Sequence, residues 1–275
     1  MRLKDKVAIV TGGGGGLGEG ISLCFAREGA DVVVSDVKME LAERVAAEVE
    51  QEGRKSLAMQ TDVRSAAQVE ELVSRTIAEL GGVDILVCCH GVSGVTHREH
   101  DPDEDLTLES VTEDDWNLTL DVNLRGVFFC NKAVTPHFKE KNAGKIINVS
   151  SVGGRTGSPM LFAYSISKAG VISLTQAVAQ QLAPYSVNVN TICPGIIYTP
   201  MWEAGAKLLM KMDPRFKDVD IEPKAGLDLM VQGAIPFKRY QTAEDIGNTA
   251  VFLASDEASE ITGQAINVCG GMHFA

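Results

Sequence analysis

The sequence predicts an α/β protein, in which a doubly wound parallel sheet of about seven strands carries helices on both faces within one domain. Two observations lead to this fold class. Short apolar runs alternate along the chain with amphipathic segments of helical spacing, the order typical of parallel strands joined by helices. The runs are also continuous in Val, Ile and Leu, as in strands buried on both faces. We therefore expect a Rossmann-like sheet.

The expected elements follow this alternation in order. Strands are predicted at residues 7–10, 31–35, 56–59, 83–87, 145–149 and 187–192, and helices at 17–28, 39–52, 66–80, 113–138 and 162–182. No repeat or low-complexity linker divides the chain, so we expect a single domain over residues 1–275. Two segments look inserted, the acidic 90–115 and the long 197–235. Long loops in compact domains are usually functional, and we expect 197–235 to be the substrate segment.

Composition limits the classes of function. The 275 residues contain 25 Lys and Arg against 37 Asp and Glu, a net charge of −12, whereas nucleic acids and anionic membranes attract basic proteins. Hydrophobic residues make up 45% of the chain, enough for a sizeable core. No apolar run has the length of a membrane span, and the start of the chain lacks a signal-peptide pattern. We expect a cytoplasmic protein with no nucleic-acid or membrane partner.

The cysteine pattern points the same way. None of the 6 cysteines forms a C-x-x-C pair, and in a cytoplasmic protein such cysteines are reduced and behave as small hydrophobes. Clustered ligand spacing is missing as well, so no metal site is predicted.

A glycine-rich turn, Thr11-Gly12-Gly13-Gly14-Gly15-Gly16-Leu17-Gly18, follows the first predicted strand and precedes a helix. Glycines allow a tight turn and a close approach to a pyrophosphate, which the helix N-terminus also attracts. The run fits two spacings, one using Gly13, Gly15 and Gly18, and the other Gly12, Gly16 and Gly18. Either spacing in this context predicts a dinucleotide site.

Asp36 ends the second predicted strand. A carboxylate there can accept hydrogen bonds from the adenosine ribose hydroxyls and would repel a 2′-phosphate. We therefore expect NAD, with NADP less favoured. Lys38 could attract the phosphate instead, and Asp36 could also serve only as a cap for the helix 39–52.

A tyrosine and a lysine, Tyr164 and Lys168, stand four residues apart on the predicted helix 162–182, so both lie on one face. A phenol is a poor base at neutral pH, but a nearby ammonium and an oxidised nicotinamide would both lower its pKa. Ser151, with Ser150 as a competitor, could hydrogen-bond a substrate oxygen. Asn123 lies in the predicted helix 113–138, either as a satisfied core amide or as part of the site.

Together these pieces resemble the short-chain dehydrogenase/reductase superfamily over essentially the whole chain. Asn123, Ser151, Tyr164 and Lys168 match its catalytic tetrad in order and spacing. Other matching segments are the cofactor turn Thr11–Gly18, the adenine-contacting pair Asp62-Val63, the Pro-Gly segment Cys193–Pro200, and Ile261–Gln264 with Gly270-Gly271 near the C-terminus.

The resemblance implies roles for these residues. Tyr164 would be the general acid and base, Lys168 would hold the nicotinamide ribose and lower the Tyr164 pKa, and Ser151 would position the substrate oxygen. Asn123 would support a water-linked proton path. The cofactor contacts implied are Gly12, Gly16, Leu17, Gly18, Asp36, Asp62, Val63, Cys89, Gly91, Tyr164, Lys168, Ile197 and Thr199.

Two segments depart from the family pattern. The Asn-Asn-Ala-Gly that follows the fourth strand is Cys88-Cys89-His90-Gly91 here, and thiols cannot make the amide hydrogen bonds that steady that turn. His90 could lie near the cofactor, or packing could compensate for the exchange. Near the C-terminus Cys269 stands where the family has Asp, which puts a polar contact of that loop in doubt.

The substrate is expected against Ser151 and Tyr164, under the substrate segment. Flexible apolar side chains there suit a bulky alicyclic alcohol or ketone such as a hydroxysteroid, although core or subunit packing would explain them equally well. They are Met201, Trp202, Leu208, Leu209, Met210, Met212 and Met230, and Met201 and Trp202 are the nearest candidates for substrate contact.

Other functions fit the same residues. Dehydrogenases of sugars, polyols or cyclic dihydrodiols fit about as well as the steroid hypothesis. A 3-oxoacyl-carrier-protein reductase shares the fold, but it usually prefers NADPH and docks an acidic carrier, which suits Asp36 and the charge of −12 poorly. An NAD-binding regulator without turnover is the non-enzyme alternative. The resemblance also implies a homotetramer.

Overall fold

The computed structural model describes residues 1–94, 107–159, 161–198 and 222–274. Its centre is one seven-stranded parallel sheet in the order β3-β2-β1-β4-β5-β6-β7. The strands are β1 (Val7–Thr11), β2 (Asp31–Asp36), β3 (Ser56–Gln60), β4 (Ile85–Cys88), β5 (Gly144–Val149), β6 (Val187–Pro194) and β7 (Ala265–Val268). The predicted doubly wound sheet is confirmed.

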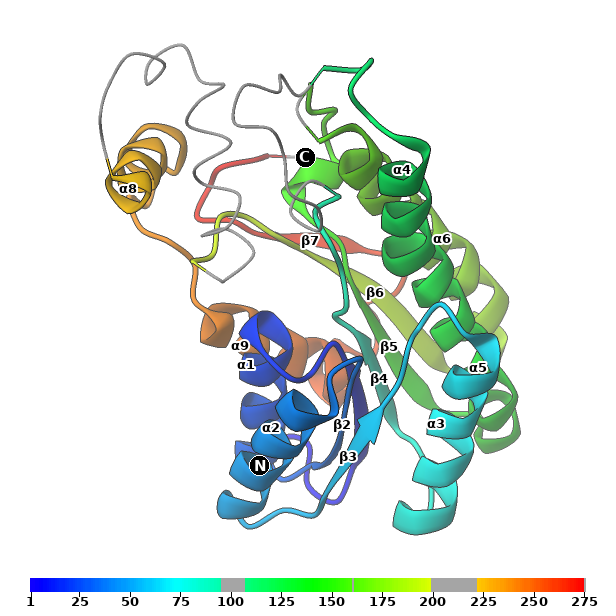
Figure 1. Cartoon of the computed structure of the whole chain (residues 1–275). Helices are drawn as coiled ribbons and strands as arrows, with labels where there is room; N and C mark the ends of the chain where they lie inside the picture. The colour runs from blue at the N-terminus through cyan, green and yellow to red at the C-terminus, as the bar shows by residue number, and fades with distance from the viewer. Residues whose placement is uncertain (95–106, 160, 199–221, 275) are drawn as a thin grey trace.

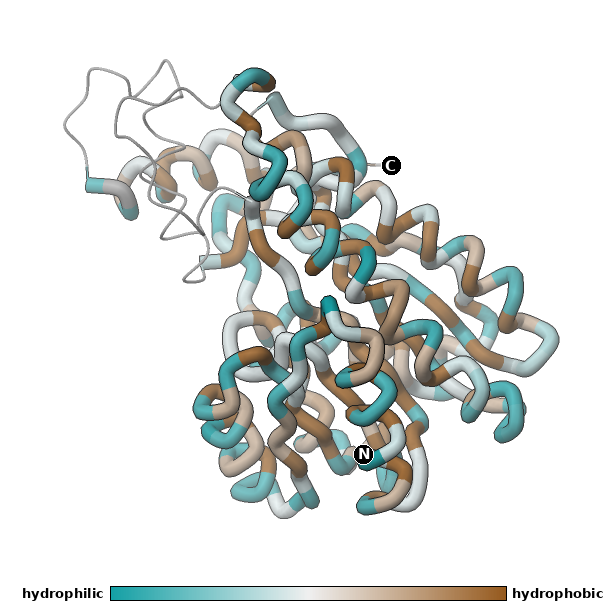
Figure 2. The backbone as a smooth tube through the Cα atoms, turned by 45° about the vertical axis from the view of Figure 1, so that its right-hand side comes forward, coloured by the Kyte–Doolittle hydropathy of each residue, from teal (hydrophilic) through white to brown (hydrophobic). Residues whose placement is uncertain are grey.

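Helices cover both faces of this sheet (Figure 1). The first layer contains α1 (Gly16–Arg27), α2 (Met39–Gln51) and α9 (Ala243–Ala254), and the second contains α3 (Ala66–Leu80), α4 (Glu113–Leu120), α5 (Gly126–Lys141) and α6 (Phe162–Leu182). In Figure 2 the hydrophobic residues concentrate on the strands and on the inward helix faces. The chain therefore buries two cores, one on each face of the sheet.

The two cores use different side chains. Phe25, Val45 and Ile246 belong to the core under the first layer, and Phe138 and Leu182 belong to the core under the second. Each apolar strand contributes side chains to both cores, because successive strand residues point to opposite faces of the sheet. This explains why the strand sequences are continuous in apolar residues.

The predicted helix over 113–138 is not one helix. It is interrupted by a π-helical turn, η1 (Asp121–Arg125), between α4 and α5. Such turns often mark functional positions, and this one contains Asn123. Periodicity did not reveal it, because one extra residue in a turn hardly changes an apolar spacing.

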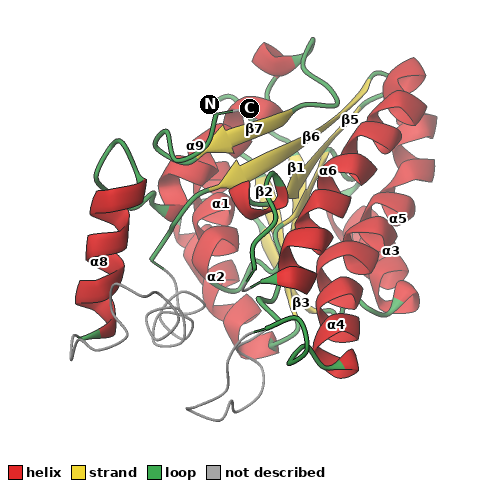
Figure 3. Cartoon of the chain, turned by 90° about the horizontal axis from the view of Figure 1, so that it is seen from above, coloured by secondary structure: helices red, strands yellow, loops and turns green. Residues whose placement is uncertain are grey.

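A further helix, α8 (Pro223–Ala234), lies inside the segment that we expected to cover the substrate. It stands beside the main body in Figure 3 and contributes to a third, small cluster formed by Ile196, Leu227, Val231 and Ile235. Met230 packs against this cluster, so its side chain fits the packing alternative. Within the part of the chain that the structure describes, no helix is long and apolar enough to cross a membrane.

Candidate active site

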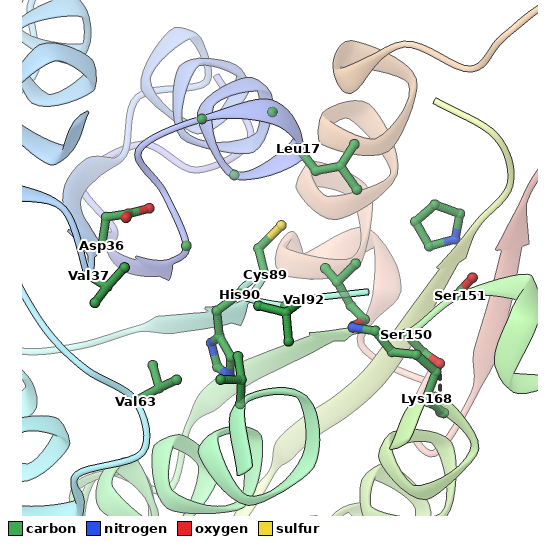
Figure 4. Close-up of a pocket in the computed structure, with 18 of the residues that line it drawn as sticks. Leu17, Asp36, Val37, Val63, Cys89, His90, Val92, Ser150, Ser151 and Lys168 are labelled. Carbon is green, nitrogen blue, oxygen red and sulfur yellow. Dashed lines mark hydrogen bonds between the residues drawn. The ribbon is translucent and has the colours of Figure 1, made fainter. Parts of the chain in front are cut away.

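A cavity of about 540 Å³ opens at the carboxyl ends of the strands. The strand order reverses direction between β1 and β4, and ligands of doubly wound sheets bind at such a switch point. In Figure 4, Asp36 and Val37 lie at one end and Ser151 and Lys168 at the other. The described cofactor candidates all line the cavity: Gly12, Gly16, Leu17, Gly18, Asp36, Asp62, Val63, Cys89, Gly91, Tyr164, Lys168 and Ile197.

Three predicted contacts cannot be placed in this cavity. Thr199, Met201 and Trp202 lie outside the residues that the structure describes. Asn123 is described, but its side chain is fully buried behind the cavity wall.

The glycine turn follows the second of the two possible spacings. Gly12 and Gly16 have φ angles of +66° and +54°, where residues with a side chain are strained. A Cβ on Gly18 would lie 2.0 Å from the Gly12 carbonyl oxygen. At Gly15, by contrast, a Cβ would meet no atom within 4 Å. The turn therefore requires glycine at Gly12, Gly16 and Gly18, and it leaves a cradle that a pyrophosphate could enter.

Asp36 is held at the edge of this cradle by backbone groups. Its Oδ2 accepts the Gly14 N–H at 3.1 Å and its Oδ1 accepts the Lys38 N–H at 3.1 Å. The N-cap of α2 is Lys38, not Asp36, so the helix-cap interpretation is wrong. The Lys38 side chain is not part of the cavity lining, in contrast to the Asp36 carboxylate.

Asp62 is held by a cation that sequence reasoning missed. Arg64 donates to both Asp62 oxygens through Nε at 3.0 Å and through Nη2 at 2.6 Å, which lowers the pKa of the Asp62 carboxyl group. Arg64 also lines the cavity. The carboxylate that the resemblance assigns to adenine is thus paired already within the protein.

The predicted catalytic side chains converge at the opposite end. Ser151, Tyr164 and Lys168 all line the cavity, and the Lys168 Nζ lies 5.8 Å from the centre of the Tyr164 ring. Lys168 is buried and donates from Nζ to the Val149 carbonyl at 2.9 Å. Burial lowers the Lys168 pKa to about 8. Helix α6 presents the pair on one face, as the spacing predicted.

The Tyr164 pKa does not follow the sequence expectation. Burial raises it above the usual value, and a hydrogen bond with the Ser151 side chain only opposes that rise. The ammonium of Lys168 is not among the groups that shift it. Within the protein alone the phenol is therefore the favoured form at neutral pH, and the positive charge of an oxidised nicotinamide would act in the same direction as the Ser151 bond and lower the Tyr164 pKa.

The two candidate serines make different contacts. Ser150 is buried and donates to the Lys168 carbonyl at 2.8 Å, whereas Ser151 bonds to the Gly153 N–H at 3.0 Å. Ser151 is the serine that reaches Tyr164.

Asn123 is a satisfied core amide. Its Oδ1 accepts the Val92 N–H at 2.8 Å, and its Nδ2 donates to the Val92 carbonyl at 2.9 Å and to the Ser167 Oγ at 3.1 Å. These bonds tie η1 to the segment after β4 and to α6. A Cβ on Gly91 would lie 3.3 Å from the Asn123 Oδ1 and 3.4 Å from the Lys168 Nζ. Asn123 thus supports the backbone beside Lys168.

His90 stabilises the segment after β4, where the sequence differs from the family pattern. Its Nδ1 lies 2.7 Å from the Thr11 Oγ1, which joins the ends of β1 and β4. Burial, and then Lys168, lower the His90 pKa to about 3, while the Val122 backbone acts in the opposite direction. The imidazole is therefore neutral. No described polar group lies within normal hydrogen-bonding geometry of its Nε2.

The thiols near the cavity are unreactive. Each of the six cysteines is unpaired. Cys89 lines the cavity, with its sulfur in view in Figure 4, and burial raises its pKa to about 12. Because the thiolate is the nucleophile, Cys89 offers a neutral contact surface. Among the described residues, no group of three His, Cys, Asp or Glu could hold a metal ion.

A family model described as enoyl-(acyl carrier protein) reductase matches residues 13–273. The 3-oxoacyl-[acyl-carrier-protein] reductase FabG of Staphylococcus epidermidis is 36% identical over 271 residues, covering 98% of this chain and all of that protein. Among solved structures, levodione reductase has a TM-score of 0.86 and 32% identity, with 98% of each chain covered. NAD⁺-bound xylitol dehydrogenase has a TM-score of 0.87 and 30% identity, covering 98% of this chain and 100% of that one.

The chain belongs to the short-chain dehydrogenase/reductase superfamily. It is an oxidoreductase that acts on alcohol and carbonyl groups with a nicotinamide cofactor.

Proposed function

We propose that this enzyme transfers hydride between NAD and a secondary alcohol or ketone. One observation carries the proposal: the Ser151 and Tyr164 side chains and the Lys168 ammonium converge at one end of a cavity whose other end holds the glycine cradle and Asp36. A nicotinamide bound in this cavity would supply the chemistry of hydride transfer to and from the carbinol carbon. The protein supplies the proton transfer and the orientation.

The proton moves through Tyr164. In the oxidative direction the hydroxyl proton of the alcohol passes to the Tyr164 phenolate as the carbinol hydrogen leaves as hydride, so the alcohol loses two electrons and becomes a ketone. Ser151 holds the substrate oxygen and bonds to the Tyr164 hydroxyl. Lys168 is positioned by the Val149 carbonyl and would hold the nicotinamide ribose. Asn123 supports this arrangement from behind.

NAD is the proposed cofactor because Asp36 lies at the adenosine end with both oxygens bound by backbone N–H groups. A carboxylate fixed in this way can accept the ribose hydroxyls but cannot turn away from a 2′-phosphate, and like charges side by side cost several kcal/mol. The NAD⁺-bound structural relative agrees with this choice.

For the substrate we propose a bulky alicyclic alcohol or ketone, with a hydroxysteroid as the leading example. Support comes from apolar side chains in the lining of the cavity that also contains Ser151 and Tyr164, among them Val92, Leu118, Val122 and Ile197. A polyol or sugar alcohol is the second candidate, favoured by the likeness to xylitol dehydrogenase. The FabG relative adds 3-oxoacyl thioesters to the candidates.

The remaining expectations from the sequence stay part of this proposal. They are a single domain, a substrate segment over 197–235 that includes α8, a homotetramer and a cytoplasmic location.

The experiment is a substrate panel followed at the nicotinamide absorbance. It pairs NAD⁺ and NADP⁺ with epimers of 3-, 7-, 12- and 17-hydroxysteroids, polyols, cyclic diols and 3-hydroxyacyl thioesters. Turnover of one steroid epimer with NAD⁺ is the expected result. Turnover of polyols or thioesters alone would keep the site but reject the alicyclic substrate, and a clear preference for NADP⁺ would reject the cofactor assignment.

A further inference from the structure

The cofactor cradle has an unusual composition. Five glycines in succession, Gly12–Gly16, form the turn between β1 and α1. Glycine loses more backbone freedom on ordering than any other residue. An unsupported run of this length would therefore lose much conformational entropy when a ligand binds, and this loss would weaken binding. Something must hold the turn if the cofactor is to bind tightly.

The contacts that hold the turn are concentrated at its centre, on Gly14. Its N–H donates to Asp36 at 3.1 Å, and its carbonyl accepts from the Arg44 Nη2 at 3.1 Å. The neighbouring Gly13 N–H donates to the Ser35 carbonyl at 2.9 Å. A Cβ on Gly14 would lie 2.7 Å from the Leu41 Cβ, so α2 packs directly against this peptide.

Arg44 is itself fixed from two helices. Its Nη2 donates to the Glu19 Oε2 at 2.6 Å, and its Nη1 donates to the Glu48 Oε1 at 2.7 Å. Glu19 lies on α1 and Arg44 and Glu48 lie on α2, two helices that are side by side in Figures 1 and 3. The planar guanidinium thus joins α1, α2 and the glycine turn in one contact, which a lysine could not do.

We propose that Arg44 is a positioning residue for the cofactor turn, held in place by Glu19. This inference rests on the proposed function, since it assumes that a dinucleotide binds in the cradle. Arg44 does not line the cavity, so it acts through the Gly14 peptide. The Arg44 bond fixes the peptide that follows Gly14, and the Asp36 bond fixes the peptide that precedes it, so the two bonds together restrain Gly14 on both sides. The turn is then ordered before the cofactor binds, which lowers the entropy lost on binding.

A rival explanation predicts the opposite effect of removing Glu19 on cofactor affinity. If Arg44 acted only as a positive charge that attracts the pyrophosphate, removal of its acidic partner Glu19 would strengthen cofactor binding. If Arg44 positions the turn, removal of Glu19 loosens the guanidinium and weakens binding.

The test measures NADH affinity of the purified enzyme by titration calorimetry for wild type, Arg44→Met and Glu19→Gln. The dissociation constant should rise about tenfold in Arg44→Met, comparable to freeing one backbone residue, and about threefold in Glu19→Gln. The turnover number at saturating NAD⁺ should stay within about twofold, because the catalytic end is untouched. Arg75→Met is the matched control, because Arg75 makes the same kind of exposed i,i+4 pair with Glu79 on α3.

The outcomes separate cleanly. An unchanged affinity in Arg44→Met relative to Arg75→Met, or tighter binding in Glu19→Gln, would overturn the proposal. Should Arg44→Met fail to fold, Glu19→Gln decides by the sign of its effect. If the wild-type enzyme itself binds no NADH, the proposed function fails, and that result is distinguishable because it appears before any variant is compared.

Discussion

The two ends of the cavity control their charges in different ways. At the buried end, defined by Tyr164 and Lys168, the largest cause of each pKa shift is loss of water. At the paired end, defined by Asp36 and Asp62, both carboxylates accept hydrogen bonds from backbone N–H groups, and Arg64 adds side-chain bonds to Asp62. Burial favours neutral groups, whereas hydrogen bonds from N–H donors favour ionised carboxylates.

The difference explains a division of labour. A buried group feels a new charge strongly because little water screens it, so the Tyr164 phenol can respond to a positive nicotinamide. A carboxylate whose oxygens are bound by N–H donors keeps its direction, and so it can discriminate between ligands. Under the proposed function, proton transfer takes place at the first end and cofactor recognition at the second.

The largest expected effect lies at the buried end. Replacing Tyr164 by Phe removes the proton donor and acceptor but keeps the ring, so turnover should fall about 10³-fold, while the NADH dissociation constant changes less than about threefold. Steady-state kinetics and calorimetry check the two halves. Tyr185→Phe, beyond the far end of α6, is the control and should keep full turnover. Wild-type-like rates in Tyr164→Phe would refute the mechanism.

At the paired end, Asp36→Ser should change specificity more than rate. Removing the carboxylate that faces the 2′-position should lower the preference for NAD⁺ over NADP⁺, measured as a ratio of kcat/KM values, about 100-fold. Asp62→Asn tests whether the effect on cofactor preference is specific to the position of Asp36, since the Asp62 carboxylate is already paired with Arg64. That variant should leave the ratio nearly unchanged, and equal effects in both variants would contradict the assignment of Asp36.

The smallest predicted effect concerns stability in acid. The folded protein keeps His90 neutral down to a pKa of about 3, whereas an unfolded histidine gains a proton near pH 6.5. The unfolded state therefore binds more protons between these values, and stability is full above pH 6.5 and falls as the pH drops. At pH 5.5 the loss from this group is about 1.4 kcal/mol.

His90→Gln should remove that loss. Urea unfolding at pH 7.5 and pH 5.5 gives the free energy of unfolding at each pH. The decrease in this free energy from pH 7.5 to pH 5.5 should be about 1.4 kcal/mol smaller in the variant than in the wild type. An identical pH dependence in both proteins would mean that His90 is not held neutral by its surroundings.

Much of the fold was readable from the sequence. Six strands and four of the five predicted helices lie within a few residues of their expected bounds, because their apolar spacing is strong and local. Residues 113–138 are helical as predicted, but the periodicity did not show the π-helical turn η1, from which Asn123 accepts the Val92 N–H. The periodicity also gave no helix over 223–234, because α8 packs on Ile196 and Ile235 rather than on the sheet.

The candidate site also has features that local sequence predicts and features that it does not. Residue type and spacing, together with the family resemblance, selected Gly12, Asp36, Ser151, Tyr164 and Lys168 as candidates, and all five line the cavity. Spacing could not decide between the two glycine patterns or between Ser150 and Ser151, because both choices satisfy the same local rule.

Tertiary contacts decided the rest. The sequence by itself determined the sheet and the place of its glycine turn, because these depend on local periodicity and on side-chain chemistry, and the family resemblance supplied the candidate catalytic residues. Only the folded structure decided that burial raises the Tyr164 pKa and that Arg44 reaches the Gly14 carbonyl from α2. Such contacts join residues distant in the chain or depend on excluded water, and neither leaves a periodic trace in the sequence.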